Sequence, residues 1–352
     1  YEKALSANPE NYHTLNNLGL ALFDKGKLEN ATQTYVKALS IKSDFHEAWN
    51  NIFFPLQAMK TKKLSREKLS YYYPKEKNIN CSEVARSLLH FKLNRNLKNE
   101  RYILDKIFNL LSRAENTTVL NAKHNDQIED LPNTIIALVH FGRSGTGLLH
   151  SLVDSHPSIS SLPSIYFSEY FDNSSWQKII ADGWDKMADN FIEIYGVLFD
   201  ASSSNPTKTQ SGKLIYDIGK KEGMANVGDN RDEILTVNKK IFQSELGKLM
   251  DQYSELDSLA FFKLVHAAYD KTIESYAQKK LIFYHIHNPS AHAQLNFARL
   301  AKKAQWLIMV RNPIQSCESW IRQAFLENDY WKVVENIITM FCQIDTIVYD
   351  EQ

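Results

Sequence analysis

The sequence predicts an α/β domain with a three-layer, parallel-sheet architecture, preceded by an α-helical repeat region. Apolar runs within Ile135–Val139, Leu281–Pro289 and Trp306–Trp320 are typical of strands buried on both faces of a parallel sheet. Near the start of the chain, YEKAL at Tyr1–Leu5 recurs as YVKAL at Tyr35–Leu39, a period of 34 residues. A fixed period of this length indicates a helical repeat array.

Composition favours a soluble globular protein of about two domains. The 352 residues are 43% hydrophobic, and 41 basic residues balance 41 acidic ones. A net charge of zero gives no support for general binding to nucleic acid or to an anionic membrane. Any anion site must therefore come from a local group of cations.

The three cysteines, Cys81, Cys317 and Cys342, are odd in number and lack metal-ligand spacing. We therefore expect no disulfide framework, no metal and a reducing, cytoplasmic location. No long uncharged apolar run or signal peptide is present, so we expect no membrane span. Because the chain begins at Tyr1 inside a repeat, we expect further repeats upstream.

Residues 1–60 resemble the tetratricopeptide repeat family. The small residues Gly19 and Ala31 allow close helix packing, and Leu15 and Tyr35 are expected to fill the layer between the helices. The resemblance implies a protein or peptide partner. Residues 61–131 are expected to form a helical connector, and residues 132–352 the second domain, which is either truncated at its C-terminus or built differently there. Within that domain we expect helices over Trp176–Leu198, Arg231–Tyr253 and Leu256–Tyr276.

A glycine-rich turn follows the first apolar run of the second domain, and an apolar-periodic segment follows the turn. The turn contains Gly142, Arg143, Ser144, Gly145, Thr146 and Gly147. Strand, glycine-rich turn and helix start are the geometry of a phosphate-binding loop, because helix N–H groups point at the anion. A plain tight turn is the alternative. The turn has no lysine, unlike a Walker A loop, and its glycines are spaced wrongly for a dinucleotide fingerprint.

The segment GRSGTGLLHSLVDSHPSI resembles the 5′-phosphosulfate loop of the sulfotransferases, written [KR]-S-G-T-[TS]. The match runs from Arg143 to Thr146, and Gly147 replaces the usual threonine or serine. The resemblance implies that residues 142–147 bind 3′-phosphoadenosine 5′-phosphosulfate (PAPS) as co-substrate. It also implies a P-loop-like sulfotransferase fold.

The second apolar run ends in His285-x-His287-Asn288-Pro289, which resembles the K-x-H-L-P element of the cytosolic sulfotransferases. By this resemblance His287 is the general base, and His285 replaces the lysine that contacts the sulfate. Histidine suits the base role because its unperturbed pKa is about 6.5. The alternative is a strand-end histidine held by local hydrogen bonds. His266 and Glu169 are the next candidates for the base.

The third apolar run continues as WLIMVRNPIQSCESW and resembles the family's strand-R-[DN]-P-x(5)-S element. Arg311 and Ser319 are eight residues apart, which is the family spacing, and by the resemblance they bind the 3′-phosphate of PAPS. His287 and Arg311 are 24 positions apart, which leaves room for one helix and a return strand. A right-handed crossover of this kind gives parallel strands.

These features predict transfer of a sulfuryl group from PAPS to an acceptor hydroxyl. Catalytic roles fall to His287, Arg143 and His285, with no metal required. The sequence does not identify the acceptor, and a protein tyrosine, a glycan and a small alcohol are all compatible with it. Two alternatives remain: a kinase-like P-loop protein that uses ATP, which the missing lysine disfavours, and a non-catalytic repeat scaffold carrying a degenerate sulfotransferase fold.

Overall fold

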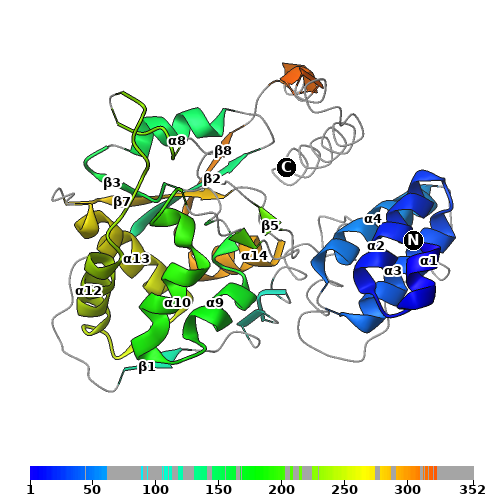
Figure 1. Ribbon diagram of the computed structural model, residues 1–352, viewed down its shortest axis with the longest axis horizontal. Coiled ribbons are helices and arrows are strands. Elements are labelled where there is room, and N and C mark those ends of the chain that lie inside the picture. Colours follow the sequence, from blue (N-terminus) through cyan, green and yellow to red (C-terminus); the bar gives the residue numbers. More distant parts are fainter. Residues whose placement is uncertain are drawn as a thin grey trace. The chain divides into compact units, whose positions relative to one another are not determined.

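The computed structural model forms two compact units, of which one contains Tyr1–Thr117 and the other begins at Thr118 (Figure 1). It describes residues 1–43, 45–61, 89, 93, 105, 107–109, 111–112, 118–121, 131–140, 145–154, 156–163, 167, 169–202, 207–208, 214–215, 224–228, 230–273, 278–286, 291–309, 312, 314–315, 317–319 and 321–322. Across these ranges, no helix has the length and apolar character needed to cross a membrane.

The first unit is helical from its first residues. Its described helices are α1 Glu2–Ala7, α2 Tyr12–Asp24, α3 Leu28–Ile41 and α4 His46–Thr61. The helix α2 begins after Asn11, whose side-chain oxygen accepts a hydrogen bond from the Thr14 N–H at 2.9 Å. This is ordinary N-capping. Gly26 adopts a φ of 71° in the turn between α2 and α3, a conformation that favours glycine.

Close packing of α2 on α3 depends on Gly19. A Cβ atom at this position would lie 2.7 Å from Cε1 of Tyr35, and Tyr35 is only 1% exposed. Ala31 is fully buried, and Leu15 is 6% exposed. The expectation that these residues pack the layer between the helices is therefore confirmed.

A parallel sheet forms the centre of the second unit. Its described strands are β2 Thr134–His140, β3 Ile159–Ser161, β7 Leu281–Ile286 and β8 Gln305–Met309. Their order is β3-β7-β2-β8, and every pairing is parallel. The strands expected within the three apolar runs are therefore present as neighbours in one sheet.

Helices cover both faces of this sheet. The helix α8 Thr146–Asp154 follows β2 and lies on one face, while α13 Ser258–Thr272 and α14 Ala291–Leu300 lie on the other (Figure 1). After β2 the chain crosses to β3, which lies on the β7 side of β2. After β7 it crosses to β8, which lies on the other side of β2. In open α/β sheets, a reversal of this kind marks the edge at which ligands bind.

The remaining described elements are not part of the four-stranded sheet. They are β1 Val119–Leu120, α9 Asn173–Ile180, η3 Trp184–Lys186, α10 Met187–Ile194, η4 Gly196–Leu198, β4 Thr207–Lys208, β5 Leu214–Ile215, α12 Lys239–Met250 and β6 Glu255–Leu256. Strand β1 pairs with β6 in antiparallel orientation, which attaches residues 119–120 to the second unit.

Two expected helices differ from the structure. The segment Trp176–Leu198 is interrupted at Gly183, whose φ of 81° is incompatible with a continuous right-handed helix. The helix expected from Arg231 begins only at Lys239. Its start is fixed by Asn238, whose side chain accepts hydrogen bonds from the N–H groups of Lys240 and Ile241.

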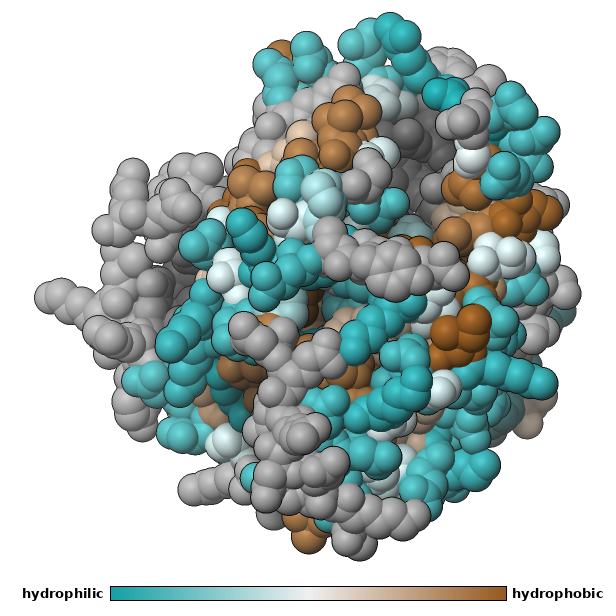
Figure 2. All heavy atoms as spheres, turned by 90° about the vertical axis from the view of Figure 1, so that its left-hand side faces the viewer, coloured by the Kyte–Doolittle hydropathy of each residue, from teal (hydrophilic) through white to brown (hydrophobic). Residues whose placement is uncertain are grey.

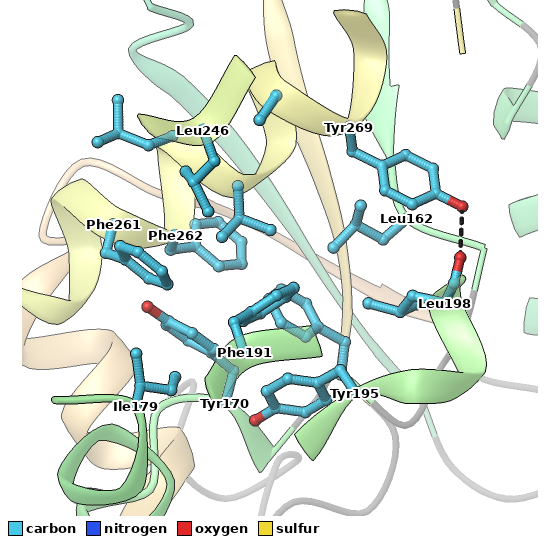
Figure 3. Close-up of a cluster of buried hydrophobic side chains, with 14 of the residues drawn as sticks. Leu162, Tyr170, Ile179, Phe191, Tyr195, Leu198, Leu246, Phe261, Phe262 and Tyr269 are labelled. Atoms are coloured by element: carbon cyan, nitrogen blue, oxygen red, sulfur yellow. Dashed lines mark hydrogen bonds between the residues drawn. The ribbon is translucent and has the colours of Figure 1, made fainter. Parts of the chain in front are cut away.

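The largest hydrophobic core lies on the α13 and α14 face and is strongly aromatic (Figure 3). Phe262 stacks on Phe167 with ring centroids 5.5 Å apart and lies 5.1 Å from Tyr284 of β7. The Tyr269 hydroxyl donates to the Leu198 carbonyl at 2.9 Å. This core fixes the position of β7 and, through the sheet, of its neighbour β2.

Hydrophobic side chains are also present at the surface. Figure 2 shows one face of the molecule, on which hydrophilic residues predominate and hydrophobic ones form separate patches. On α8, Leu148 and Leu152 are each 69% exposed, whereas Leu149 and Val153 are partly buried. The apolar residues of α8 therefore do not form one buried face.

Candidate functional site

Three neighbouring strands end at the same edge of the sheet. The register pairs Val139 of β2 with Ile286 of β7, and His140 of β2 with Met309 of β8. The described ends of β7, β2 and β8 therefore lie side by side. In the sequence they are followed by the His287 segment, the glycine-rich loop and the Arg311 segment, respectively.

Several predicted site residues lie outside the described residues. They are Gly142, Arg143, Ser144, His287 and Arg311. The structure fixes the strand ends from which their segments start, and it describes Gly145, Gly147, His285 and Ser319 directly. For Thr146 it describes the backbone, which begins α8.

The end of the glycine-rich loop is a turn that depends on glycine and leads directly into α8. Gly145 has a φ of 92°, a conformation that L-residues other than glycine rarely adopt. Its carbonyl accepts hydrogen bonds from the N–H groups of Leu148 at 3.1 Å and Leu149 at 3.2 Å, so α8 starts immediately. The first N–H groups of a helix have no intrahelical acceptors and carry a partial positive charge.

Space around this turn is restricted on one side and open on the other. A Cβ atom at Gly145 would meet Cε of Met309, in β8, at 3.7 Å. A Cβ atom at Gly147 would have no neighbour within 4 Å. The loop end therefore lies against β8. The predicted site needs this proximity, because it uses residues of both the loop and the segment after β8.

His285 lies under α8. It is 5% exposed, and its ring centroid is 5.6 Å from that of His150 on α8. The neighbouring Tyr284 points to the opposite face, where its ring lies 5.2 Å from Phe297 of α14. The predicted sulfate contact is thus a buried side chain on the loop's side of the sheet.

Asn312, which follows β8 in the sequence, has the contact of a capping residue. The Asn312 side chain accepts a hydrogen bond from the Ile314 N–H at 2.9 Å, which favours a helix start directly after Arg311. Ser319 lies within the helical residues 317–319 and is half-buried. Ser319 thus follows Asn312 on a helical segment, as we expect from its spacing of eight residues from Arg311.

His266 is a core residue. Its Nδ1 lies 3.0 Å from Oγ of Ser160, and its ring lies 4.7 Å from that of Phe262. Complete burial lowers the pKa of His266 to about 3, so its imidazole is a weak base at neutral pH. The structure therefore places His266, one of the two further candidates for the base, in the aromatic core. Glu169, the other candidate, is half-buried and directly precedes the buried Tyr170.

The sequence analysis missed His150. This side chain is one helical turn after Thr146, so a helical-wheel projection of α8 would have placed it near the loop. Its contact with His285 joins positions 135 residues apart, and no local pattern predicts such a contact.

One comparison with known proteins identifies part of the chain. Residues 12–45 match the tetratricopeptide repeat family, and these residues span α2 and α3. The N-terminal unit therefore contains a tetratricopeptide repeat. Comparison with curated proteins gave no match.

Proposed function

We propose that the second unit transfers a sulfuryl group from PAPS to an acceptor hydroxyl. The observation that carries this proposal is the common edge at which β7, β2 and β8 end. Three segments that resemble sulfotransferase elements start from that edge. Three matching segments that follow neighbouring strand ends are stronger support than any one of them alone.

The described loop end fits the co-substrate. A positive φ at Gly145 and open space at Gly147 let an anion approach the backbone closely. The N-terminus of α8 supplies free N–H groups for phosphate and sulfate oxygens. Arg143 would add a forked cation at the 5′-phosphosulfate, and Arg311 with Ser319 would hold the 3′-phosphate.

The reaction is an in-line displacement at sulfur. The acceptor oxygen forms a bond to sulfur while the bond from sulfur to the bridging phosphate oxygen breaks. His287 takes the acceptor proton, and the electron pair of the broken bond stays on the 5′-phosphate of the product, 3′-phosphoadenosine 5′-phosphate (PAP). Arg143 and His285 stabilise the charge that develops on the oxygens, so catalysis is chiefly positioning and electrostatics.

In this proposal the tetratricopeptide repeat recruits the acceptor or a partner. Such repeats usually bind proteins or peptides, so an acceptor hydroxyl on a protein or a glycosylated polymer fits the architecture. A non-catalytic scaffold is the competing function, and the repeat at residues 12–45 is the observation that favours it.

A thermal-shift experiment on the full chain tests the proposal. A ligand that binds only the folded protein raises its Tm by mass action. We expect a shift with PAP that ATP at equal concentration does not reproduce, and loss of that shift in Arg143→Ala and Arg311→Ala. A shift with ATP alone would favour the kinase reading, and no shift with either ligand would favour the scaffold.

A further inference from the structure

The two faces of the central sheet have different chemistry. On the α13 and α14 face, β7 contributes Tyr284 to the aromatic core. On the α8 face, β7 contributes Phe283 and His285, which are 4% and 5% exposed. A small core under a single helix therefore contains a buried imidazole, although burial of a polar ring is unfavourable without a compensating interaction.

A second imidazole comes from α8 itself. His150 contacts both β7 residues of this face, with ring centroids 5.6 Å from His285 and 6.1 Å from Phe283. The planes of the two imidazoles are inclined by 34°. His150 is four residues after Thr146, the first residue of α8, and hence one turn from the loop.

Both ring nitrogens of His150 are buried, and within the described part of the chain no hydrogen bond of ordinary geometry reaches them. Burial lowers the pKa of His150, while the Asp154 carboxylate and, more weakly, the Leu162 backbone raise it. Asp154 accepts a hydrogen bond from Ser161 Oγ at 2.6 Å. His150 is therefore neutral at neutral pH.

We propose that His150 is a positioning residue of the transfer site, which holds the ring of His285 in place beneath the phosphate-binding loop. A preorganised donor stabilises a developing charge better than a mobile one, because no reorganisation is needed during the reaction. The inference rests on the proposed function, in which His285 faces the sulfuryl group.

Protonation of His150 would disturb this arrangement. Two positive charges on neighbouring buried imidazoles would repel each other, so a proton on His150 would act against its contact with the ring of His285. The titratable groups around His150 are His285 on β7 and Asp154 on α8, while Tyr269 and Asp270 on α13 interact with Asp154. The described residues of β3, Ile159–Ser161, include no titratable side chain.

His150→Phe tests the proposal, because phenylalanine retains a ring against His285 but has no nitrogen. We expect kcat to fall about 10- to 100-fold, as for other small losses of positioning, while PAP affinity changes less than about twofold. We expect His150→Gln, which restores a polar group, to recover part of kcat. Leu152→Ala, on the exposed side of the same helix, is the matched control and should leave kcat unchanged.

The pH profile and an NMR titration separate a positioning role from a packing role. In wild type we expect the His285 resonance to respond to protonation of His150, and in His150→Phe we expect that response to disappear and the acid limb of kcat to change. Unchanged kcat and pH profile in His150→Phe would overturn the inference, as would equal losses of kcat and PAP binding. Absence of PAP binding by wild type would instead overturn the proposed function, and the NMR titration would still report whether the two rings interact.

Discussion

Oγ of Ser160 and Nδ1 of His266 lie 3.0 Å apart in the protein interior. The contact joins β3 to α13 and holds His266 as an uncharged core residue. One turn further along α13, Asp270 is 6% exposed, and its Oδ1 lies 3.7 Å from Nζ of Lys279. These two buried titratable groups give stability opposite dependences on pH.

His266 makes the fold less stable in acid. Burial lowers its pKa to about 3 in the folded protein, whereas the unfolded chain takes up the proton below about pH 6.5. The free energy of unfolding therefore falls as the pH drops below about 6.5, by about 2 kcal/mol between pH 7 and pH 5. We expect His266→Gln to remove this difference in urea unfolding at the two pH values. An equally steep decrease in the variant would contradict the assignment.

Asp270 makes the fold less stable as the pH rises, which is the opposite of the effect of His266. Burial raises its pKa to about 6, above the value of about 3.9 in an unfolded chain. The folded protein holds this proton more tightly, so the stability that it contributes is present at about pH 4 and is lost as the pH rises through 6. Asp270→Asn should therefore make stability rise more steeply with pH between about 4.5 and 6.5, by about 2 kcal/mol in total. Guanidinium unfolding at those two pH values measures the change, and a flatter dependence would refute it.

Gly145 should tolerate no side chain. With a φ of 92°, alanine would cost about 1–2 kcal/mol from backbone strain alone, although its Cβ would meet Met309 at only an ordinary contact distance. We expect Gly145→Ala to lower the Tm and abolish the shift with PAP. Gly247→Ala is the matched control, because Gly247 lies within α12, its Cβ has open space and alanine is the better helix former by up to about 1 kcal/mol.

In the repeat unit, Gly19→Ala should loosen α2 and α3. The added Cβ would overlap Cε1 of Tyr35 at 2.7 Å, and overpacking of this kind costs about 1–3 kcal/mol. Hydrogen exchange of the full chain should show faster exchange in α2 and α3. Unchanged exchange there would mean that Tyr35 can move aside.

His287→Ala should separate binding from turnover. Loss of a general base lowers kcat by about 10²- to 10⁴-fold, whereas PAP affinity should stay within about twofold because the phosphates are held elsewhere. His156→Ala is a suitable control, since His156 is exposed and its Nδ1 accepts from the Ser158 N–H. Retained turnover in His287→Ala would place the base at another residue.

The sequence was informative where structure follows from local pattern. The apolar run at Ile135–Val139 predicted β2, and the spacing of His287 and Arg311 predicted a parallel crossover, which α14 provides between β7 and β8. Parallel pairing then places the three segments at one edge, because parallel strands end together.

Contacts between residues that are far apart in the sequence could not be predicted from local pattern. Leu148 and Leu152 fit the apolar period of α8, yet each is 69% exposed, whereas Leu149 and Val153 of the same period are partly buried. Burial of His266 against Ser160 depends on residues 106 positions apart. A histidine on an amphipathic helix has the same local pattern whether it is buried or exposed.

The central place of β2 determines when the site would be lost during unfolding. Its backbone is bonded to β7 on one side and to β8 on the other, so its amides open only when the sheet itself opens. Exchange from such amides reports the global free energy of unfolding, while edge strands exchange through smaller, local openings. The glycine-rich loop therefore follows a strand that is paired on both sides, and partial unfolding that releases β8 would leave that strand paired with β7.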